Sequence, residues 1–550
     1  MLRIKYVVCV LCILSISILW GGSDVKVNQD LGPLLQNEAT LTLNPAAPGN
    51  VIIAYNEDPG GSHGATNGIG ISYSFNYGAS WSDTQVVQVW GIEGDPCLDA
   101  STTGRIYAGF ISYQGFFDDT NGIYVAYSTD SGQTWSTPVT VDSFLNTPSS
   151  LGPFTDKCFL CVDNHSGSPY TDYVYITWQR DNTNGVNSDV YFAASYDGGL
   201  TYTNLQQISD LIPPAGECVG QVPKAAPDGD VYVLWADFGL SGHTTGYLYI
   251  DVSTDSGANW GTDVLIDSFL VVPRYPNAPT NNTFYVRSYP TIGISPANSN
   301  HIYAAVAADP DGLGGLDDGD IHFWRSADGG ATWSGPVTVN DDNTTMDQFQ
   351  PWMDVKASGR IDIVWLDRRN DPFDQNFDIY FAYSTDYGQS FSTNQRVTDV
   401  TFPLLADPNG WLGEYIGIDV DQNTAYIAWA DTRNLDRDIY FDSIHNPVIN
   451  IDELDMTMEE VTVTRIFPNP FTTEATIEFS MPVADFAEFR VYDASGKLVE
   501  NLLEKHLEAG IHEVVWNGHC QSGMKLPAGV YFLEINTGNQ FAVKKVVLLE

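Results

Sequence analysis

Apolar and polar residues alternate in short segments throughout the first 446 residues of the chain. These segments are rich in β-branched and aromatic residues, as in "VYITWQRD" from Val174 and "VYFAASYD" from Val190. Both features predict β-strands. The segments recur in units of four, and seven units follow one another, the last with only three segments. Such a series is typical of a β-propeller, so we predict an all-β, seven-bladed β-propeller, with six blades as the alternative if one unit is misread.

The fourth strand of the last blade has a candidate near the start of the chain. The segment "SDVKVNQD" from Ser23 resembles "GPVTVNDD" from Gly335, which is an outer strand of the repeat. We expect the N-terminal strand to complete the last blade and to close the ring, which removes open sheet edges.

One eight-residue turn occurs six times between the third and fourth strands of a unit. Its copies start at Ser74, Ser128, Ser195, Ser253, Ser326 and Ser384. An aspartate that accepts backbone hydrogen bonds, a glycine and a closing aromatic residue are all turn-building elements. Because six identical catalytic centres in one ring are implausible, we predict a structural role for its aspartates, which are Asp130, Asp197, Asp255, Asp328 and Asp386.

The pattern S-x-D-x-G-x-[ST]-W resembles the Asp-box, or BNR repeat, of sialidase-like propellers, over roughly residues 24–446. The first copy has Asn76 in place of the aspartate, and the fourth has Asn259 in place of Ser or Thr. The resemblance implies that the boxes lie on the face opposite the substrate. Function is therefore expected on the other face, which carries the loops between the second and third strands.

Arginine lies close to aspartate in three of those loops. The two can tie their own loop together, which the repetition of the motif favours, or can form a polar rim that binds sugar hydroxyls or a carboxylate. Two further arginines precede an inner strand and are expected to point inward. The binding-face candidates are Arg180, Asp181, Arg274, Arg287, Asp367, Arg369, Asp431 and Arg433.

Sialidase activity is not carried over by the resemblance. The family's chemistry uses three arginines around the substrate carboxylate, a Tyr–Glu nucleophile pair and an Asp acid/base, and the first arginine lies near the start of the domain. This chain has no arginine between Lys5 and Gly104. The sequence also lacks HExxH, GxSxG and P-loop motifs. Paired carboxylates for another glycoside hydrolysis stay open, because their separation is invisible in a sequence.

The loop "DPDGLGGLDDGD" clusters aspartate with glycine. Hard oxygen ligands of this kind suit Ca²⁺, which is the one cofactor that the sequence suggests, but the spacing is not that of an EF-hand. A solvated acidic loop is the favoured interpretation. The candidate ligands are Asp309, Asp311, Asp317, Asp318 and Asp320.

The charge and the N-terminus restrict the partners. The 550 residues include 24 Lys and Arg against 69 Asp and Glu, a formal net charge of −45. Such a surface repels nucleic acid and anionic membranes. Residues 1–23 hold two basic residues and then an apolar run, which predicts an export signal and, after its removal, no transmembrane span.

Five cysteines follow the predicted signal. Their odd number and irregular spacing are not those of a disulfide framework. Cys158 and Cys161 form a CxxC, but no second CxxC completes a zinc site, so we interpret the pair as buried thiols in a strand. At most one bridge is expected, and the pairing among Cys97, Cys158, Cys161 and Cys218 stays open.

After an acidic linker at 447–460, the segments of residues 461–550 predict a small antiparallel sandwich with turns at 493–496, 517–518 and 537–539. "PNPF" at 468, "VYDASGK" at 491, "AGVYF" at 528 and a basic end follow in order. They resemble the C-terminal sorting domain of the type IX secretion system, with similarity to the FlgD-like Ig fold. The resemblance implies a Gram-negative bacterium of the Bacteroidetes type, contact with the type IX machinery, and a secreted or surface location.

Three functions are compatible with these features. The first is a propeller that binds a glycan or another extracellular ligand without catalysis. The second is an exo-acting glycoside hydrolase of sialidase type with an atypical arginine site. The third is a surface adhesion or scaffold protein.

Overall fold

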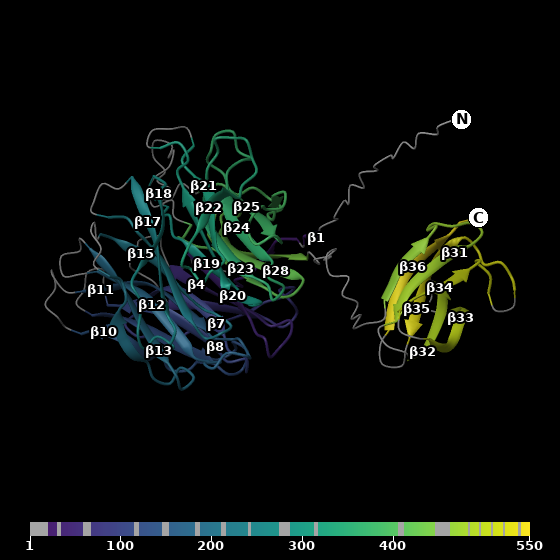
Figure 1. The fold of residues 1–550 in the computed structure, drawn as a ribbon, viewed down its shortest axis with the longest axis horizontal. Coiled ribbons are helices and arrows are strands. Elements are labelled where there is room, and N and C mark those ends of the chain that lie inside the picture. The colour runs from purple at the N-terminus through teal and green to yellow at the C-terminus, as the bar shows by residue number, and fades with distance from the viewer. Residues whose placement is uncertain are drawn as a thin grey trace, which may run out of the picture. The chain divides into compact units, whose positions relative to one another are not determined.

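The computed structural model describes residues 20–21, 23–29, 35–58, 68–114, 120–145, 153–181, 187–210, 216–239, 244–273, 286–312, 317–404, 412–445, 462–481, 485–493, 497–507, 510–520, 523–536 and 541–549. They divide into two compact units, Met1–Pro447 and Val448–Glu550 (Figure 1). The regular elements of the described residues are all strands, and within them no helix is long and apolar enough to cross a membrane.

The first unit consists of seven antiparallel sheets in chain order. The first blade contains β3 (Leu35–Leu43), β4 (Val51–Asp58), β5 (Gly68–Ser74) and β6 (Ser82–Gln85). The second contains β7 (Ile92–Ala100), β8 (Ile106–Tyr113), β9 (Asn121–Ser128) and β10 (Val139–Phe144). The third contains β11 (Phe154–Val162), β12 (Val174–Asp181), β13 (Ser188–Ser195) and β14 (Thr203–Gln207). The fourth contains β15 (Cys218–Ala225), β16 (Val231–Asp237), β17 (Thr245–Ser253) and β18 (Val264–Leu270). The fifth contains β19 (Thr291–Ser295), β20 (Asn298–Ala308), β21 (Asp320–Ser326) and β22 (Ser334–Thr338). The sixth contains β23 (Gln348–Val355), β24 (Ile361–Asp367), β25 (Asp378–Ser384) and β26 (Gln395–Arg396). The seventh combines β27 (Gly417–Val420), β28 (Thr424–Asp431) and β29 (Asp438–His445) with β1 (Trp20–Gly21) and β2 (Val25–Lys26).

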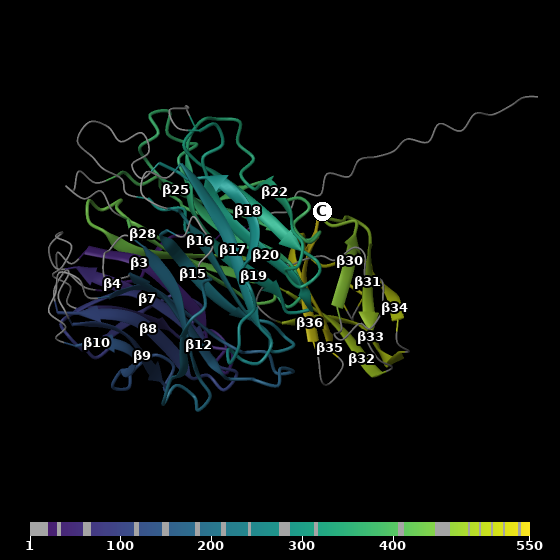
Figure 2. The same cartoon turned by 60° about the vertical axis from the view of Figure 1, so that its left-hand side comes forward.

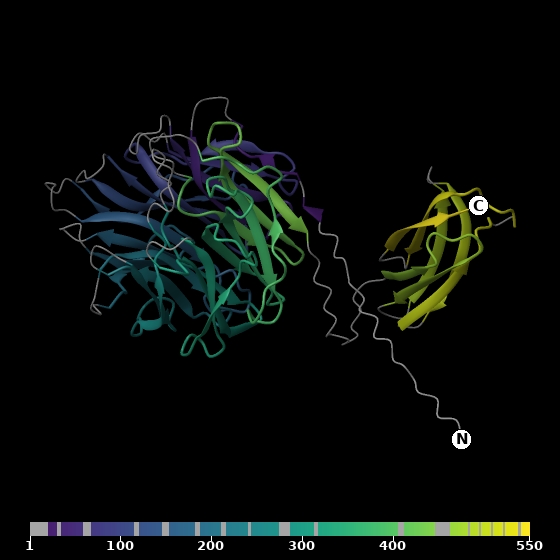
Figure 3. The ribbon, with the colours of Figure 1, turned by 90° about the horizontal axis from the view of Figure 1, so that it is seen from above.

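The innermost strands form a closed ring. Each contacts the innermost strand of the next blade, and β27 contacts β3. Figure 2 shows the purple strand β3 beside the green strand β28 of the last blade. The seven-bladed propeller is therefore confirmed, and the six-bladed alternative is wrong. The N-terminal closure is also confirmed, because β2 pairs with β29 through Val25↔Phe441 and Lys26↔Tyr440. Figure 3 shows the purple N-terminal strands beside the green strands of this last blade.

Aromatic pairs stack between neighbouring strands of several blades. The second strand of each blade is buried on both faces, and four of these strands carry a tryptophan that stacks on a tyrosine of the third strand. The ring centroids of Trp178 and Tyr191 lie 6.0 Å apart, and those of Trp365 and Tyr380 lie 6.3 Å apart. Each such pair contributes about 1 kcal/mol beyond its buried area, so these four blades are stabilised in the same way.

The repeated turn has one hydrogen-bond pattern. In the second copy, Asp130 Oδ1 accepts bonds from the Ser128 hydroxyl (2.8 Å) and the Thr134 amide (2.9 Å), while Oδ2 accepts from the Thr134 hydroxyl (2.6 Å). The two deviating copies keep this pattern. Asn76 Oδ1 accepts from the Ser80 amide at 2.9 Å, and Asn259 Nδ2 donates to the aspartate of its own turn at 2.7 Å. An asparagine therefore serves at either position of the turn.

The inner strands begin at the face opposite these turns. Neighbouring strands are antiparallel, so the start of each inner strand lies beside the end of its second strand, as in Phe154↔Asp181 and Gln348↔Asp367. Five inner strands contain a β-bulge close to this start. At three bulges a charged residue has a positive φ: Glu38 (54°), Asp95 (54°) and Lys157 (44°). Bulges redirect side chains, and these three turn toward one another.

The second unit is a sandwich of two sheets, which confirms the predicted fold. One sheet contains β30 (Thr462–Phe467), β31 (Ala475–Met481) and β34 (Gly510–Trp516); the other contains β33 (Leu498–Leu507), β32 (Asp485–Asp493), β35 (Gly529–Asn536) and β36 (Phe541–Leu548). Its core includes Phe479, Phe489 and Trp516. The predicted turn at Asn517–Gly518 follows β34, and residues 494–496 and 537–540, where the other two turns were expected, lie outside the described residues.

Candidate functional site

A buried lysine joins four blades at the centre of the face that carries the loops between second and third strands. Lys157 Nζ lies 2.8 Å from Glu38 Oε1, 3.1 Å from Asp95 Oδ1 and 2.6 Å from Glu414 Oε2. The side chains of all four are at most 9% exposed. We call Glu38, Asp95, Asp156, Lys157, Asp181, Glu217, Arg287 and Glu414 the central cluster.

An arginine extends the cluster toward the fourth and fifth blades. Arg287 forms an ion pair with Glu217, and its Nε lies 3.8 Å from Glu414 Oε1. The Tyr289 hydroxyl donates to Glu414 Oε2 at 3.2 Å. The cluster is therefore continuous from one side of the channel to the other, and Glu414 links its two cations.

The protons are unevenly distributed over the carboxyl groups. Burial raises the pKa of Glu38 and of Asp156 well above the usual range, and the charge of Asp95 adds to both effects. Burial also opposes ionisation of Asp95, but Lys157 and the hydrogen-bonded carboxyls of Glu38 and Asp156 lower the pKa of Asp95 below its usual value. Burial alone would lower the pKa of Lys157, yet the surrounding carboxylates raise it well above its ordinary value. Asp95 is thus easier to ionise than an ordinary aspartate, whereas Glu38 and Asp156 are harder to ionise than usual.

The central cluster is acidic overall. It contains six carboxyl groups and two cations, and both cations already form ion pairs. Asp156, Asp181, Glu217 and Arg287 are partly exposed, whereas the remaining members are buried. A ligand at this face therefore meets partly exposed carboxyl groups, with buried charge behind them.

Two predicted candidates belong to the cluster. Arg287 is one. Asp181 is the other, and burial raises the pKa of its carboxyl group, with Glu217 adding to the rise and Arg287 opposing it. Arg180 lies elsewhere: it pairs with Asp142 of the preceding blade and lies 3.6 Å from the centre of the Tyr191 ring. Arg274, which was predicted to point inward, is outside the described residues.

The other predicted residues hold their own loops and neighbouring outer strands. Arg369 Nε donates to both carboxylate oxygens of Asp367 at 3.0 Å, and its Nη1 lies 2.8 Å from Asp341 of the preceding blade. Arg433 repeats the arrangement in the last blade, with Asp431 and Asp24 as partners at 2.6 Å each.

The core of the cluster was missed at the sequence level. Glu38, Asp95, Lys157 and Glu414 lie at or near the starts of inner strands, in "NEATL", "GDPCL", "TDKCF" and "GEYIG". The sequence did contain one signal for this cluster: a charged residue recurs near the start of several inner-strand segments that are otherwise largely apolar. Their convergence depends on the bulges and on the closed ring, which the residue pattern does not display.

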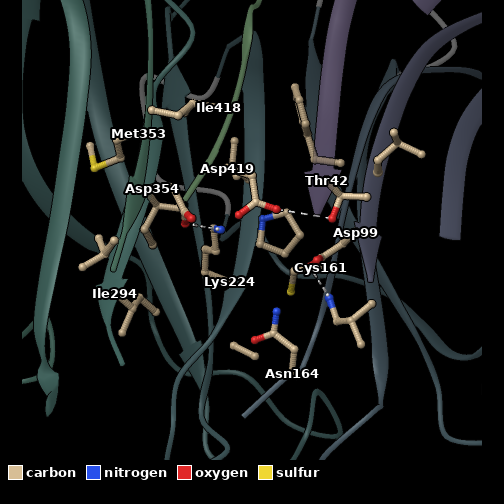
Figure 4. Close-up of a pocket in the computed structure, with 18 of the residues that line it drawn as sticks. Thr42, Asp99, Cys161, Asn164, Lys224, Ile294, Met353, Asp354, Ile418 and Asp419 are labelled. Carbon is tan, nitrogen blue, oxygen red and sulfur yellow. Dashed lines mark hydrogen bonds and ion pairs between the residues drawn. The ribbon is translucent and has the colours of Figure 1, made fainter. Parts of the chain in front are cut away.

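The opposite end of the channel forms a cavity of about 310 Å³, lined by the inner strands of all seven blades (Figure 4). Lys224 Nζ lies 3.3 Å from Asp354 Oδ1. Burial raises the pKa of Asp99 to about 6 and that of Asp419 to about 8. The rings of Phe159, Trp352 and Tyr415, with centroids 5.4–6.0 Å apart, pack together in the channel, and the first two also line this cavity.

The loop predicted as a calcium site is partly described. Asp309 Oδ1 accepts hydrogen bonds from the Gly312 amide (2.6 Å) and the Asp311 amide (3.1 Å). Asp320 Oδ1 accepts a hydrogen bond from the side-chain amide of Asn340. Among the described residues, no group of three or more His, Cys, Asp or Glu side chains is arranged to hold a metal ion. The calcium site stays a prediction.

Comparisons with known proteins identify the C-terminal unit. Residues 465–549 match the family described as the secretion system C-terminal sorting domain. No curated protein matches the sequence of the chain. The sorting domain indicates a secreted or cell-surface protein of a Gram-negative bacterium of the Bacteroidetes type, and implies contact with the type IX secretion machinery.

Solved structures are similar to the chain in fold. A protein of unknown function from Dyadobacter fermentans has 13% identity and a TM-score of 0.44, covering 78% of this chain and 99% of its own. The Hadza microbial sialidase Hz136 has 14% identity and a TM-score of 0.43, covering 72% and 74%. The α-L-arabinofuranosidase Arb93A from Fusarium graminearum has 14% identity and a TM-score of 0.41, covering 64% and 92%. The chain is thus an exported β-propeller protein with a type IX sorting domain.

Proposed function

We propose that this exported propeller binds an extracellular glycan at the central cluster and does not hydrolyse it by the sialidase route. The observation that supports the proposal is the Lys157 ion-pair network, which is buried, central and built from residues at the inner strands of separate blades. Preorganised polar groups at the centre of a scaffold are suited to binding a small polar ligand.

The charge of the cluster selects the class of glycan. Carboxylates accept hydrogen bonds from sugar hydroxyl groups and attract ammonium groups. The carboxylate of a sialic or uronic acid would instead face six carboxyl groups, with Lys157 and Arg287 already paired. We therefore propose neutral sugars or amino sugars as ligands. Among the described arginines, Arg287 is the one that contacts the cluster, which is not the arginine trio of a sialidase.

Two isosteric variants test the site. Asp156→Asn and Glu217→Gln change partly exposed members of the cluster, and Asp228→Asn changes an exposed aspartate at the opposite face. For the best ligand of a glycan array, titration calorimetry with the full-length protein should show at least tenfold weaker binding for the first two and unchanged binding for Asp228→Asn. Equal affinities in all three variants would place the glycan elsewhere.

A glycoside hydrolase is the second candidate, favoured by the opposite pKa shifts of two neighbouring carboxyl groups: the pKa of Asp156 is raised and that of Asp95 is lowered. Carboxyl groups with separated pKa values are the usual acid/base equipment of such enzymes. A panel of fluorogenic glycosides distinguishes the two. Turnover by the wild type that is lost in Asp156→Asn would favour the enzyme, whereas binding without turnover favours the first proposal.

A further inference from the structure

Two buried cysteines of neighbouring blades are in contact directly beside the central cluster. The sulfur atoms of Cys97 in β7 and Cys158 in β11 lie 3.9 Å apart. Both side chains are at most 3% exposed. Cys97 follows Asp95 by two residues and Cys158 follows Lys157 directly, so the thiols lie at the ends of the two bulges that carry these charges.

The space around the sulfurs favours their approach. Gly109 of β8 lies behind Cys97, and a Cβ atom at this position would be 2.8 Å from the Cys97 sulfur. The glycine therefore leaves room for the thiol. A disulfide has a sulfur–sulfur distance of about 2.05 Å, so the two side chains must approach further than in the observed contact for the bond to form.

The other cysteines of the propeller lack this arrangement. Cys161 and Cys218 are also buried thiols, but within the described residues neither is in contact with another sulfur. Of the cysteine pairings that the sequence left open, the geometry therefore supports the one between Cys97 and Cys158.

We propose that Cys97 and Cys158 are joined by a disulfide in the exported protein. The sorting domain places the chain outside the cytoplasm, where disulfides form and persist. Two S–H bonds are lost and one S–S bond forms. The two protons and two electrons pass to the disulfide of a thiol oxidoreductase of the cell envelope, which becomes its dithiol.

Because both thiols are buried in the folded ring, we expect the bond to form before they are enclosed. Burial raises the pKa of the Cys158 thiol well above its ordinary value, so the folded protein contains little of the thiolate that attacks a disulfide. Once formed, the bond links the second and third blades and fixes the backbone on both sides of the Asp95–Lys157 ion pair, whose atoms lie 3.1 Å apart. The cross-link is thus a positioning element of the central cluster.

Peptide mapping of the full-length protein tests the proposal without any variant. The protein is exported to the periplasm of a host bacterium, denatured in N-ethylmaleimide without reductant, and digested. We expect a cross-linked peptide pair that contains Cys97 and Cys158, while Cys161 and Cys218 carry the label. Quantitative labelling of Cys97 and Cys158 would overturn the proposal.

A stability measurement adds a second readout. Reductant should lower the Tm of the wild type by several degrees and leave that of the Cys97→Ser/Cys158→Ser variant unchanged. Cys161→Ser is the matched control and should keep both the cross-link and the response to reductant. A wild-type Tm that is insensitive to reductant, in protein whose map shows free thiols, would contradict the cross-link.

Discussion

The carboxylate of Asp24 lies 2.6 Å from Nη1 of Arg433 and so ties the first strand of the propeller to its last blade. Asp24 and Asp399 also exchange hydrogen bonds from their backbone amides, at 2.8 and 3.2 Å. The same reciprocal arrangement joins Asp341 to Asn394 between the fifth and sixth blades. The N-terminal strand therefore occupies the outer-strand position of the seventh blade in contacts as well as in pairing.

Closure can be tested by a double-mutant cycle on this ion pair. Asp24 is 2% and Arg433 13% exposed at the side chain, so removal of either partner leaves a largely buried charge. We expect Asp24→Asn and Arg433→Met each to lower the free energy of unfolding by about 3 kcal/mol, and the double variant to lose less than the sum. Additive losses in chemical denaturation would show that the pair does not contribute to closure.

The repeated turn should tolerate asparagine but not alanine. Hydrogen bonds from the side chain and backbone of Thr332 lower the pKa of Asp328, and the first copy of the turn already uses an asparagine. We expect Asp328→Ala to lower the Tm by a few degrees and Asp328→Asn to change it little at pH 4. Because the folded pKa lies below the unfolded value of 3.8, the ionised aspartate contributes stability above that pH and loses it as the pH falls. Asp328→Asn should remove this acid dependence in thermal melts from pH 2 to 6, and an unchanged dependence would contradict the assignment.

Two glycines separate backbone strain from packing in the propeller. Gly257 has a φ of 84°, and a Cβ there would lie 2.2 Å from the Phe192 ring of the adjoining blade; Gly91 has a φ of 98° with open space around its Cβ position. Gly91→Ala should cost about 1 kcal/mol of unfolding free energy from backbone strain alone. Gly257→Ala should cost about 2–4 kcal/mol, because the aromatic ring must also move. Equal costs in urea denaturation would refute close packing of this turn on its neighbour.

The cavity at the turn face should make stability depend on pH. Burial, with a contribution from Asp354, raises the pKa of Asp419 to about 8. The folded state therefore binds a proton that the unfolded state releases above pH 3.8, so stability falls as the pH rises from 3.8 to 8. Asp419→Asn keeps an acceptor for the Leu43 amide but removes the titration. The variant should gain stability relative to the wild type between pH 4 and pH 8, as measured by the urea midpoint, and a parallel pH profile would contradict this cause.

The fold could be predicted because its signals are local and repeated. The alternation within a strand and the turn of six blades each lie within a few residues, and the segments at Ser23 and Gly335 are similar over eight residues. The candidate site could be predicted only in part. Asp181 was singled out because it follows an arginine in a loop, and Arg287 because it precedes an inner strand. Glu38 and Lys157 lie in segments that were interpreted only as strands, and their ion pair joins the first and third blades. The second partner of Arg433 was equally hidden, since Asp24, unlike Asp431, is distant in sequence.

The charge preference of the propeller tests the central claim most directly. Binding of the labelled full-length protein is measured on a glycan array that displays neutral, amino and sialylated forms of the same core glycans. The acidic central cluster predicts binding to neutral or amino sugars that decreases when a sialic acid is added at the terminus. Preferred binding to the sialylated forms would contradict the account, because the six carboxyl groups around Lys157 and Arg287 would then not be the surface that the ligand meets.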